Sequence, residues 1–251
     1  RPVTVYCSDI CSYTALVEGH SHAENLAWIN DYLMAMEGPI HGHGGFVEGV
    51  AGDSIIALFG SGADAGLRAA IESLDALDAL NARRVARGQP PLRIGIGLTH
   101  GECLMGVLGG DERLQCSVVG DPANLAARVE SLTKQLGTLL ITGPTRDALV
   151  DPRRYTLRYV DRVRVRGQRA PTTLYEVLDV LPAEERERKL STADKLAEAL
   201  SRYQAGEVAG AKALFEELAR RDPHDRAFAW HLGRLREGSA QGAALGVDGA
   251  T

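Results

Sequence analysis

Two aspartates stand where a pair of carboxylates could share a divalent cation. Asp9 follows the apolar run 3–7, and Asp53 lies between the two apolar halves of the segment 46–59, directly after Gly52. We interpret this segment as a strand, a tight turn and a second strand, because glycine adopts the positive φ that such a turn needs. Two carboxylates that meet at strand ends would hold a metal ion, and such a centre is suited to phosphoryl or nucleotidyl transfer.

Each aspartate also has an ordinary explanation. An aspartate after a strand is most often a turn former or a helix cap, and the pair Gly-Asp is a common turn signal. The chemical interpretation therefore depends on the segments around the two residues.

Composition narrows the class of protein. The 251 residues, 45% of them apolar, are enough for one large domain or for one domain with an appendage. A net charge of −5 argues against a nucleic-acid partner. The four cysteines form no CxxC pair, which indicates free thiols in a reducing compartment.

The hydropathy of the chain and its first residues bear on its location. No apolar run approaches the roughly 18 to 20 residues of a membrane span, and no signal peptide is visible, so we expect a cytoplasmic protein. Because the chain begins with Arg1 rather than Met, the sequence leaves open whether a regulatory or membrane-anchored segment precedes it.

Hydrophobic periodicity predicts the elements that position the two aspartates. They are a strand over 3–7, a helix over 21–40, the hairpin 46–59, a helix over 63–87 and a strand over 92–98. Ser21 and Glu24 form a capping box at the start of the first helix. The order β-α-β-β-α-β is the ferredoxin-like pattern of an α+β fold, with an antiparallel sheet and its helices on one face. The fold alone does not fix a function.

The remainder of the first domain, which we expect to span 1–180, continues with mixed elements. They are a glycine-rich segment over 101–110, a strand over 116–119, a helix over 121–135, a strand over 139–142 and a strand pair over 155–165 and 172–178. Asp121 and Pro122 fit the cap and the first position of the helix.

Helical patterns replace strands after residue 180. We expect a helical extension over 181–237 and a disordered tail over 238–251. The extension resembles a tetratricopeptide-type helical hairpin in the spacing of Ala199, Tyr203, Gly206, Ala211, Phe215 and Pro223. One such unit cannot bury its own apolar face, so it should dock on the first domain, on a partner chain or on another body.

Six segments of the first domain occur in an order typical of one family. They are 3–10, 43–45, 50–53, 95–97, 101–109 and 118–128. Each is a weak signal alone, but together residues 2–179 resemble the class III nucleotidyl cyclase family.

The resemblance implies a reaction and roles for particular residues. Asp9 and Asp53, with the carbonyl of Ile10, would bind two Mg²⁺ or Mn²⁺ ions. Asn124 would orient the ribose of a nucleoside triphosphate, and Arg128, one helical turn later, would stabilise the transition state. The ribose 3′-hydroxyl attacks the α-phosphorus, and pyrophosphate leaves. Taken by itself, Arg128 is more simply a surface arginine.

Phosphate and base recognition follow the family pattern less closely. Arg113 matches a residue that contacts phosphate, although a solvated loop charge explains it equally well. The lysine usual near the last strand pair is replaced, so its role falls to Arg169 or Arg166 or is unfilled. In the family, two positions select the base. The first usually holds Lys for adenine or Glu for guanine, and the second usually holds Asp or Thr for adenine and Cys or a small residue for guanine. Here they hold Gly49 and Ser117, and neither pattern is met. ATP is the first choice of substrate from family frequency, GTP the second and a pyrimidine triphosphate the third.

In the family the site lies between two chains, one holding the metals and the other contacting base, ribose and transition state. The resemblance therefore implies a head-to-tail homodimer with two equivalent sites. An active cyclase is the favoured hypothesis. A degenerate nucleotide-binding regulatory domain is the second, because Gly49 and Gln168 depart from the pattern, and a helical adaptor is the third.

Overall fold

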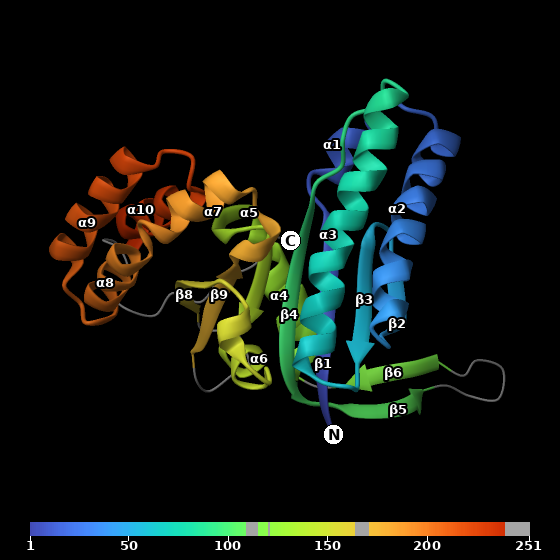
Figure 1. Ribbon diagram of the computed structural model, residues 1–251, viewed down its shortest axis with the longest axis horizontal. Coiled ribbons are helices and arrows are strands. Elements are labelled where there is room, and N and C mark those ends of the chain that lie inside the picture. The colour runs from blue at the N-terminus through green and yellow to red at the C-terminus, as the bar shows by residue number, and fades with distance from the viewer. Residues whose placement is uncertain (109–114, 120, 164–170, 239–251) are drawn as a thin grey trace.

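The computed structural model describes residues 1–108, 115–119, 121–163 and 171–238 (Figure 1). The first half contains β1 (Pro2–Ile10), α1 (Tyr13–Val17), α2 (His22–Gly42), β2 (Phe46–Ala51), β3 (Ser54–Phe59), α3 (Ala63–Ala86), β4 (Ile94–Glu102), β5 (Leu104–Leu108) and β6 (Gln115–Val119). The second half contains α4 (Asp121–Ser131), α5 (Thr133–Leu136), β7 (Leu139–Thr142), α6 (Gly143–Asp147), β8 (Leu157–Val163), β9 (Thr172–Val177), α7 (Ala183–Leu190), α8 (Ala193–Gln204), α9 (Val208–Arg221) and α10 (Arg226–Gly238), with short 3₁₀ turns at Pro152–Arg154 and Leu178–Val180.

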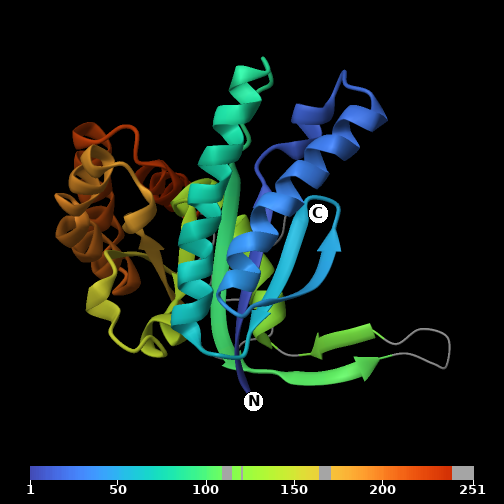
Figure 2. The same cartoon turned by 45° about the vertical axis from the view of Figure 1, so that its right-hand side comes forward.

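A seven-stranded sheet runs through the body in the order β2-β3-β1-β4-β7-β9-β8. Its first four strands pair antiparallel, with β1 between β3 and β4, and β7 extends the sheet parallel to β4. The helices α2 and α3 lie together on one face of these strands (Figures 1 and 2). The predicted ferredoxin-like α+β class is confirmed.

The face under α2 and α3 holds the largest apolar cluster. Tyr32 and Met36 recur on one side of α2 and are fully buried against the strands. Ser21 accepts the backbone N–H of Glu24, and the carboxylate of Glu24 accepts the N–H of Ser21, so the capping box is confirmed. The hydroxyls of Ser8 and Tyr32 lie 2.8 Å apart, which identifies the side of β1 that faces these helices.

The opposite face of β1 and β4 is covered by α4. A Cβ added at Gly97 would stand 2.4 Å from the backbone nitrogen of Glu130, and one at Gly95 would stand 1.9 Å from the hydroxyl oxygen of Thr133. Neither position tolerates a side chain without movement. Gly97 therefore allows the backbone of α4 to approach β4 closely, and Gly95 leaves room for the side chains of Thr133 of α5 and Glu130 of α4.

The two-stranded ribbon β5–β6 differs from expectation. Sequence analysis places no strand in the glycine-rich segment 101–110, yet β4 continues to Glu102 and β5 pairs antiparallel with β6. The ribbon extends away from the end of the sheet (Figures 1 and 2). The apolar residues of 104–108 favour a strand and outweigh the glycine among them.

The C-terminal helices pack onto the sheet domain. Residues of α8, α9 and α10 share one apolar cluster with α4, α5, β7, β8 and β9. At its edge the buried Arg158 of β8 pairs with Glu176 of β9 at 2.6 Å and with Asp225, which precedes α10. The sequence leaves open whether the helical extension docks on the first domain, on a partner chain or on another body. In the structure it docks on the first domain. The likeness of 181–237 to a tetratricopeptide unit stays a prediction, and the expected tail lies, from residue 239, outside the described residues.

The longest helices are amphipathic. Within the described ranges, α2 and α3 have 21 and 24 residues, and each carries charged side chains on its outer side. No helix among the described residues combines the length and apolar character needed to cross a bilayer.

Candidate active site

The hairpin β2–β3 positions Asp53. Ala51 pairs with Ser54 across the turn, and Gly52 adopts a φ of 64°, which glycine takes without strain. The half-buried Asp53 follows, and its Oδ2 accepts a hydrogen bond from the backbone N–H of Ile10 at 3.2 Å. The carboxylate at the hairpin tip is therefore tied to β1.

Asp9 lies beside Asp53 at the end of β1. Because Ser8 points to Tyr32 under the helices, strand alternation directs Asp9 to the other face, toward α4. Burial raises the pKa of Asp9 to about 6, and the charge of Asp53 and a hydrogen bond with it add to that rise. The two carboxyl groups, 44 positions apart in the sequence, thus lie within hydrogen-bonding reach of each other.

A third carboxylate, Glu130 of α4, stands near this pair and was missed by sequence reasoning. Burial, and then the charge of Asp9, raise the pKa of Glu130 to about 7; Asp53 adds to the rise, while Lys134 of α5 opposes it. Its Oε1 has no hydrogen-bond partner among the described residues. The available signal was its place four residues after Ala126, on the face of α4 that meets Gly97.

The donor set at Asp9 and Asp53 fits a hard divalent cation. Carboxylate oxygens are the ligands that Mg²⁺ and Mn²⁺ prefer, and Mg²⁺ commonly takes only one or two carboxylates together with water and substrate phosphates. The described residues contain no group of three or more His, Cys, Asp or Glu side chains placed to hold a metal. The carbonyl of Ile10 stays a predicted ligand.

Asn124 and Arg128 lie one turn apart on α4, and both are exposed. The start of this helix is held by Thr99, whose hydroxyl donates to the carbonyl of Pro122 at 2.7 Å. Within the described parts of the chain, neither Asn124 nor Arg128 has a side-chain hydrogen bond or ion pair. The cation that acts on the pKa of Asp9 is Lys134 of α5, not Arg128. The structure therefore groups Asn124 with Arg128, but presents both to solvent rather than to the carboxylates of their own chain.

The remaining predicted residues are placed only in part. Gly49 lies where the pairing of β2 with β3 shifts register, and a Cβ added there would meet no atom within 4 Å. Ser117 lies on β6, paired with Gly106 of β5. Arg113 and Arg169, the candidate phosphate contacts, lie outside the described residues.

Residues 1–178 match the family model described as "Adenylate and Guanylate cyclase catalytic domain". The chain is similar to an adenylate cyclase of Anabaena cylindrica, with 38% identity over 184 residues, and to adenylate cyclase 1 of Rhizobium meliloti, with 29% identity over 190 residues. These matches cover 70% and 73% of this chain but only 37% and 28% of the relatives. The chain thus spans about a third of the length of these relatives.

Two solved structures share the fold. The guanylyl cyclase Cya2 superimposes with a TM-score of 0.65 at 30% identity, covering 73% of this chain and 94% of that one. The adenylyl cyclase CyaB from P. aeruginosa superimposes with a TM-score of 0.65 at 28% identity, covering 71% of this chain and 94% of that one. Because one of these proteins is named a guanylyl cyclase and the other an adenylyl cyclase, the similarities do not decide between guanine and adenine as the base of the substrate.

Proposed function

Since this chain belongs to the adenylate and guanylate cyclase catalytic-domain family, we propose that it converts a nucleoside triphosphate to the 3′,5′-cyclic monophosphate and pyrophosphate. ATP is the first choice of substrate and GTP the second. The observation that carries the proposal is the meeting of the Asp9 and Asp53 carboxyl groups at the end of β1.

In the proposed site, Asp9 and Asp53 hold two Mg²⁺ or Mn²⁺ ions, with the carbonyl of Ile10 as a further ligand. Such ions, when bound, activate the ribose 3′-hydroxyl and neutralise charge on the triphosphate. The chain contributes preorganisation, because the hydrogen bond from the N–H of Ile10 to Asp53 fixes one carboxylate against the strand that carries the other.

Asn124 and Arg128 serve, in this proposal, the substrate held by a second copy of the chain. The amide of Asn124 orients the ribose, and the guanidinium of Arg128 stabilises the charge that develops on the phosphate. Support comes from their exposure on α4 and from the absence of side-chain partners for them among the described residues. A head-to-tail homodimer, with α4 of one protomer facing β1 of its partner, would complete two equivalent sites.

A nucleotide-binding domain without turnover is the second candidate function. The observation that favours it is Gly49, which offers no group to read a base and stands in open space. The two intact carboxylates, together with Asn124 and Arg128, favour the cyclase.

The test is incubation of the purified chain with Mn²⁺ and each of the four nucleoside triphosphates in turn, with the product identified by mass. We expect a cyclic monophosphate from ATP or GTP, and we expect Asp53→Ala to reduce the rate at least about a thousandfold while the melting temperature stays close to that of the wild type. Asp75→Ala, which changes an exposed aspartate of α3, is the matched control and should keep full activity.

Two results would contradict the proposal. Absence of a cyclic product from all four triphosphates would favour the second candidate. A wild-type rate for Asp53→Ala would show that this carboxylate does not hold a catalytic ion.

A further inference from the structure

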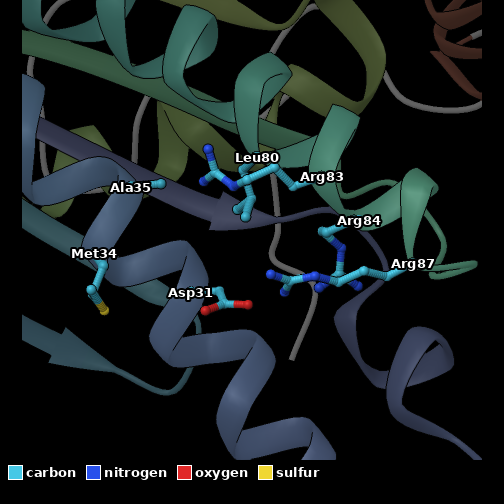
Figure 3. Close-up of a pocket in the computed structure, with 7 residues that line it drawn as sticks. All are labelled: Asp31, Met34, Ala35, Leu80, Arg83, Arg84 and Arg87. Atoms are coloured by element: carbon cyan, nitrogen blue, oxygen red, sulfur yellow. The ribbon is translucent and has the colours of Figure 1, made fainter.

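An open pocket of about 250 Å³ lies between the helices α2 and α3, as shown in Figure 3. It lies on the side of the sheet that α2 and α3 cover, whereas Asp9 points to the side that α4 covers. The lining residues are Asp31, Met34, Ala35, Leu80, Arg83, Arg84 and Arg87. In Figure 3 the arginine side chains extend from α3 toward α2, with Arg87 directed to the side of Asp31. Three arginines against one aspartate make the lining attractive to anions.

Arg84 distinguishes this pocket from an ordinary basic surface. Only 1% of the residue is exposed. Its Cζ lies 4.7 Å from the ring centroid of Trp28, and its Nε donates to the carbonyl of Pro90 at 3.0 Å. Nη1 and Nη2, however, are buried without a hydrogen-bond partner among the described residues. Buried donors are almost always paired in folded proteins, so two unpaired ones on a guanidinium point to an acceptor from outside the chain.

Asp31 does not supply that acceptor. Its negative charge acts on Arg84 and partly offsets the effect of burial, which lowers the pKa of that arginine. Within the described parts of the chain, however, no ion pair of 4.0 Å or less joins Asp31 to Arg83, Arg84 or Arg87. The positive charge of the pocket is therefore only partly balanced.

We propose that the pocket binds a small organic molecule in which a phosphate or carboxylate stands next to an apolar group. The two unpaired nitrogens of Arg84 match the two oxygens of such an anion, and the exposed Arg83 and Arg87 add attraction at the rim. Leu80 and Met34 offer apolar contact for the rest of the molecule. A small molecule fits better than a protein surface, because the unpaired donors are buried in the lining.

The experiment is calorimetric titration of the full chain with four probes. Phenyl phosphate and benzoate join an oxyanion to an apolar ring, inorganic phosphate carries the anion alone, and benzyl alcohol carries the apolar ring alone. We expect one molar equivalent of phenyl phosphate or benzoate to bind, inorganic phosphate to bind more weakly and benzyl alcohol not to bind. Comparison of the first two probes distinguishes a phosphate ligand from a carboxylate ligand.

Variants locate the binding. Arg83→Gln combined with Arg87→Gln should weaken the binding at least about tenfold, while Arg220→Gln, at an exposed arginine of α9, should leave it unchanged. Arg84 is not substituted in these variants, because its stacking on Trp28 contributes to the packing of α2 on α3. Because phosphate compounds can also enter the triphosphate site, the titration is repeated with Asp53→Ala, which should bind the probe as the wild type does.

Three results would overturn the inference. One is that no probe binds. Another is that binding is unchanged when Arg83 and Arg87 are replaced, or is lost with Asp53→Ala, which would place it elsewhere. The last is that an acidic peptide binds where every small probe fails, which would assign the pocket to a protein partner.

Discussion

Among the individual residues of the proposed site, Gly49 constrains the substrate least. It stands at the register shift between β2 and β3, and no atom lies within 4 Å of a Cβ added there. Packing within the chain therefore does not require glycine at this position. Discrimination between adenine and guanine needs a group that pairs with the edge of the base, and glycine supplies none.

The first residue-scale prediction follows from that open space. Gly49→Lys should raise the ratio of kcat/KM for ATP over GTP about tenfold, the order of effect that one added hydrogen bond gives, because lysine is the usual adenine-reading residue in the family. The measurement is the rate with each triphosphate at limiting concentration. Gly49→Ala, which adds a side chain without a donor, should leave the ratio unchanged. An equal change for both triphosphates, or a shift toward GTP, would contradict this role.

Glu130 belongs to a part of the site that could not be predicted from the sequence. Asp9 and Asp53 were recognisable because each follows a strand pattern and belongs to a local motif. Glu130 affects the pair only because α4 crosses β4 at the positions of Gly95 and Gly97. That crossing depends on contacts between segments far apart in the chain, and no local spacing encodes it.

At the scale of secondary-structure elements, the contact of α4 with β4 sets where Asn124 and Arg128 stand. A Cβ at Gly97 would fall 2.4 Å from the backbone of Glu130 and 2.7 Å from the carbonyl of Ala126. Backbone atoms cannot turn aside as a flexible side chain does, so the helix itself would have to move.

Gly97→Ala is therefore expected to damage both stability and turnover. Overpacking should lower the free energy of unfolding by about 1–3 kcal/mol, and displacement of the residues on α4 should lower kcat at least about tenfold. Thermal melting and steady-state rates measure the two effects. Gly38→Ala is the control, because that position on α2 has no atom within 4 Å of the added Cβ, and it should keep full activity. Unaltered kcat and melting temperature in Gly97→Ala would show that α4 does not need this close approach.

The packing of α10 on β8 gives an element-scale prediction about pH. The ring of His231 stacks on Phe215 with centroids 4.9 Å apart, and its Nε2 lies 2.9 Å from the carbonyl of Val160. Burial lowers the pKa of His231 below its ordinary 6.5, although Asp161 opposes the effect. The unfolded chain then binds a proton at a higher pH than the folded chain, so this group reduces the free energy of unfolding as pH falls below about 6.5.

Melting temperatures across that pH range test the role of His231. His231→Phe should melt lower than the wild type at pH of about 7.5, because the contact with Val160 is lost, but should lose less on acidification to pH of about 5. His22→Gln changes an exposed histidine and should keep the wild-type slope. Identical slopes for His231→Phe and the wild type would contradict a lowered pKa for this histidine.

At this scale, features that depend on neighbouring residues could be predicted from the sequence, whereas features built from distant segments could not. The capping box at Ser21 and the turn at Gly52 depend on neighbouring residues, and both were predicted from the sequence. The strand β5 was missed because glycine interrupts its apolar pattern. The place of the C-terminal helices was left open, since the cluster that buries Phe215 is shared with α4 and β8 and is built from distant segments.

At the scale of the whole molecule, no hydrogen bond or ion pair among the described residues joins the two halves of the proposed site within one chain. The carboxylates of Asp9 and Asp53 meet at the end of β1, while Asn124 and Arg128 are exposed on α4. A single chain therefore supplies both halves without joining them. The C-terminal helices are compatible with this arrangement, because they contact β8 and α5, share an apolar cluster with the buried side of α4, and leave Arg128 exposed.

The most direct test of a site shared between two chains is the activity of a mixed dimer. Asp53→Ala and Arg128→Ala chains, carrying different affinity tags, are coexpressed, and the heterodimer is purified through both tags. Each homodimer should be inactive, whereas the heterodimer, in which one of two sites keeps both Asp53 and Arg128, should recover about half of the wild-type rate. A heterodimer that forms but stays as inactive as either parent would contradict the shared site.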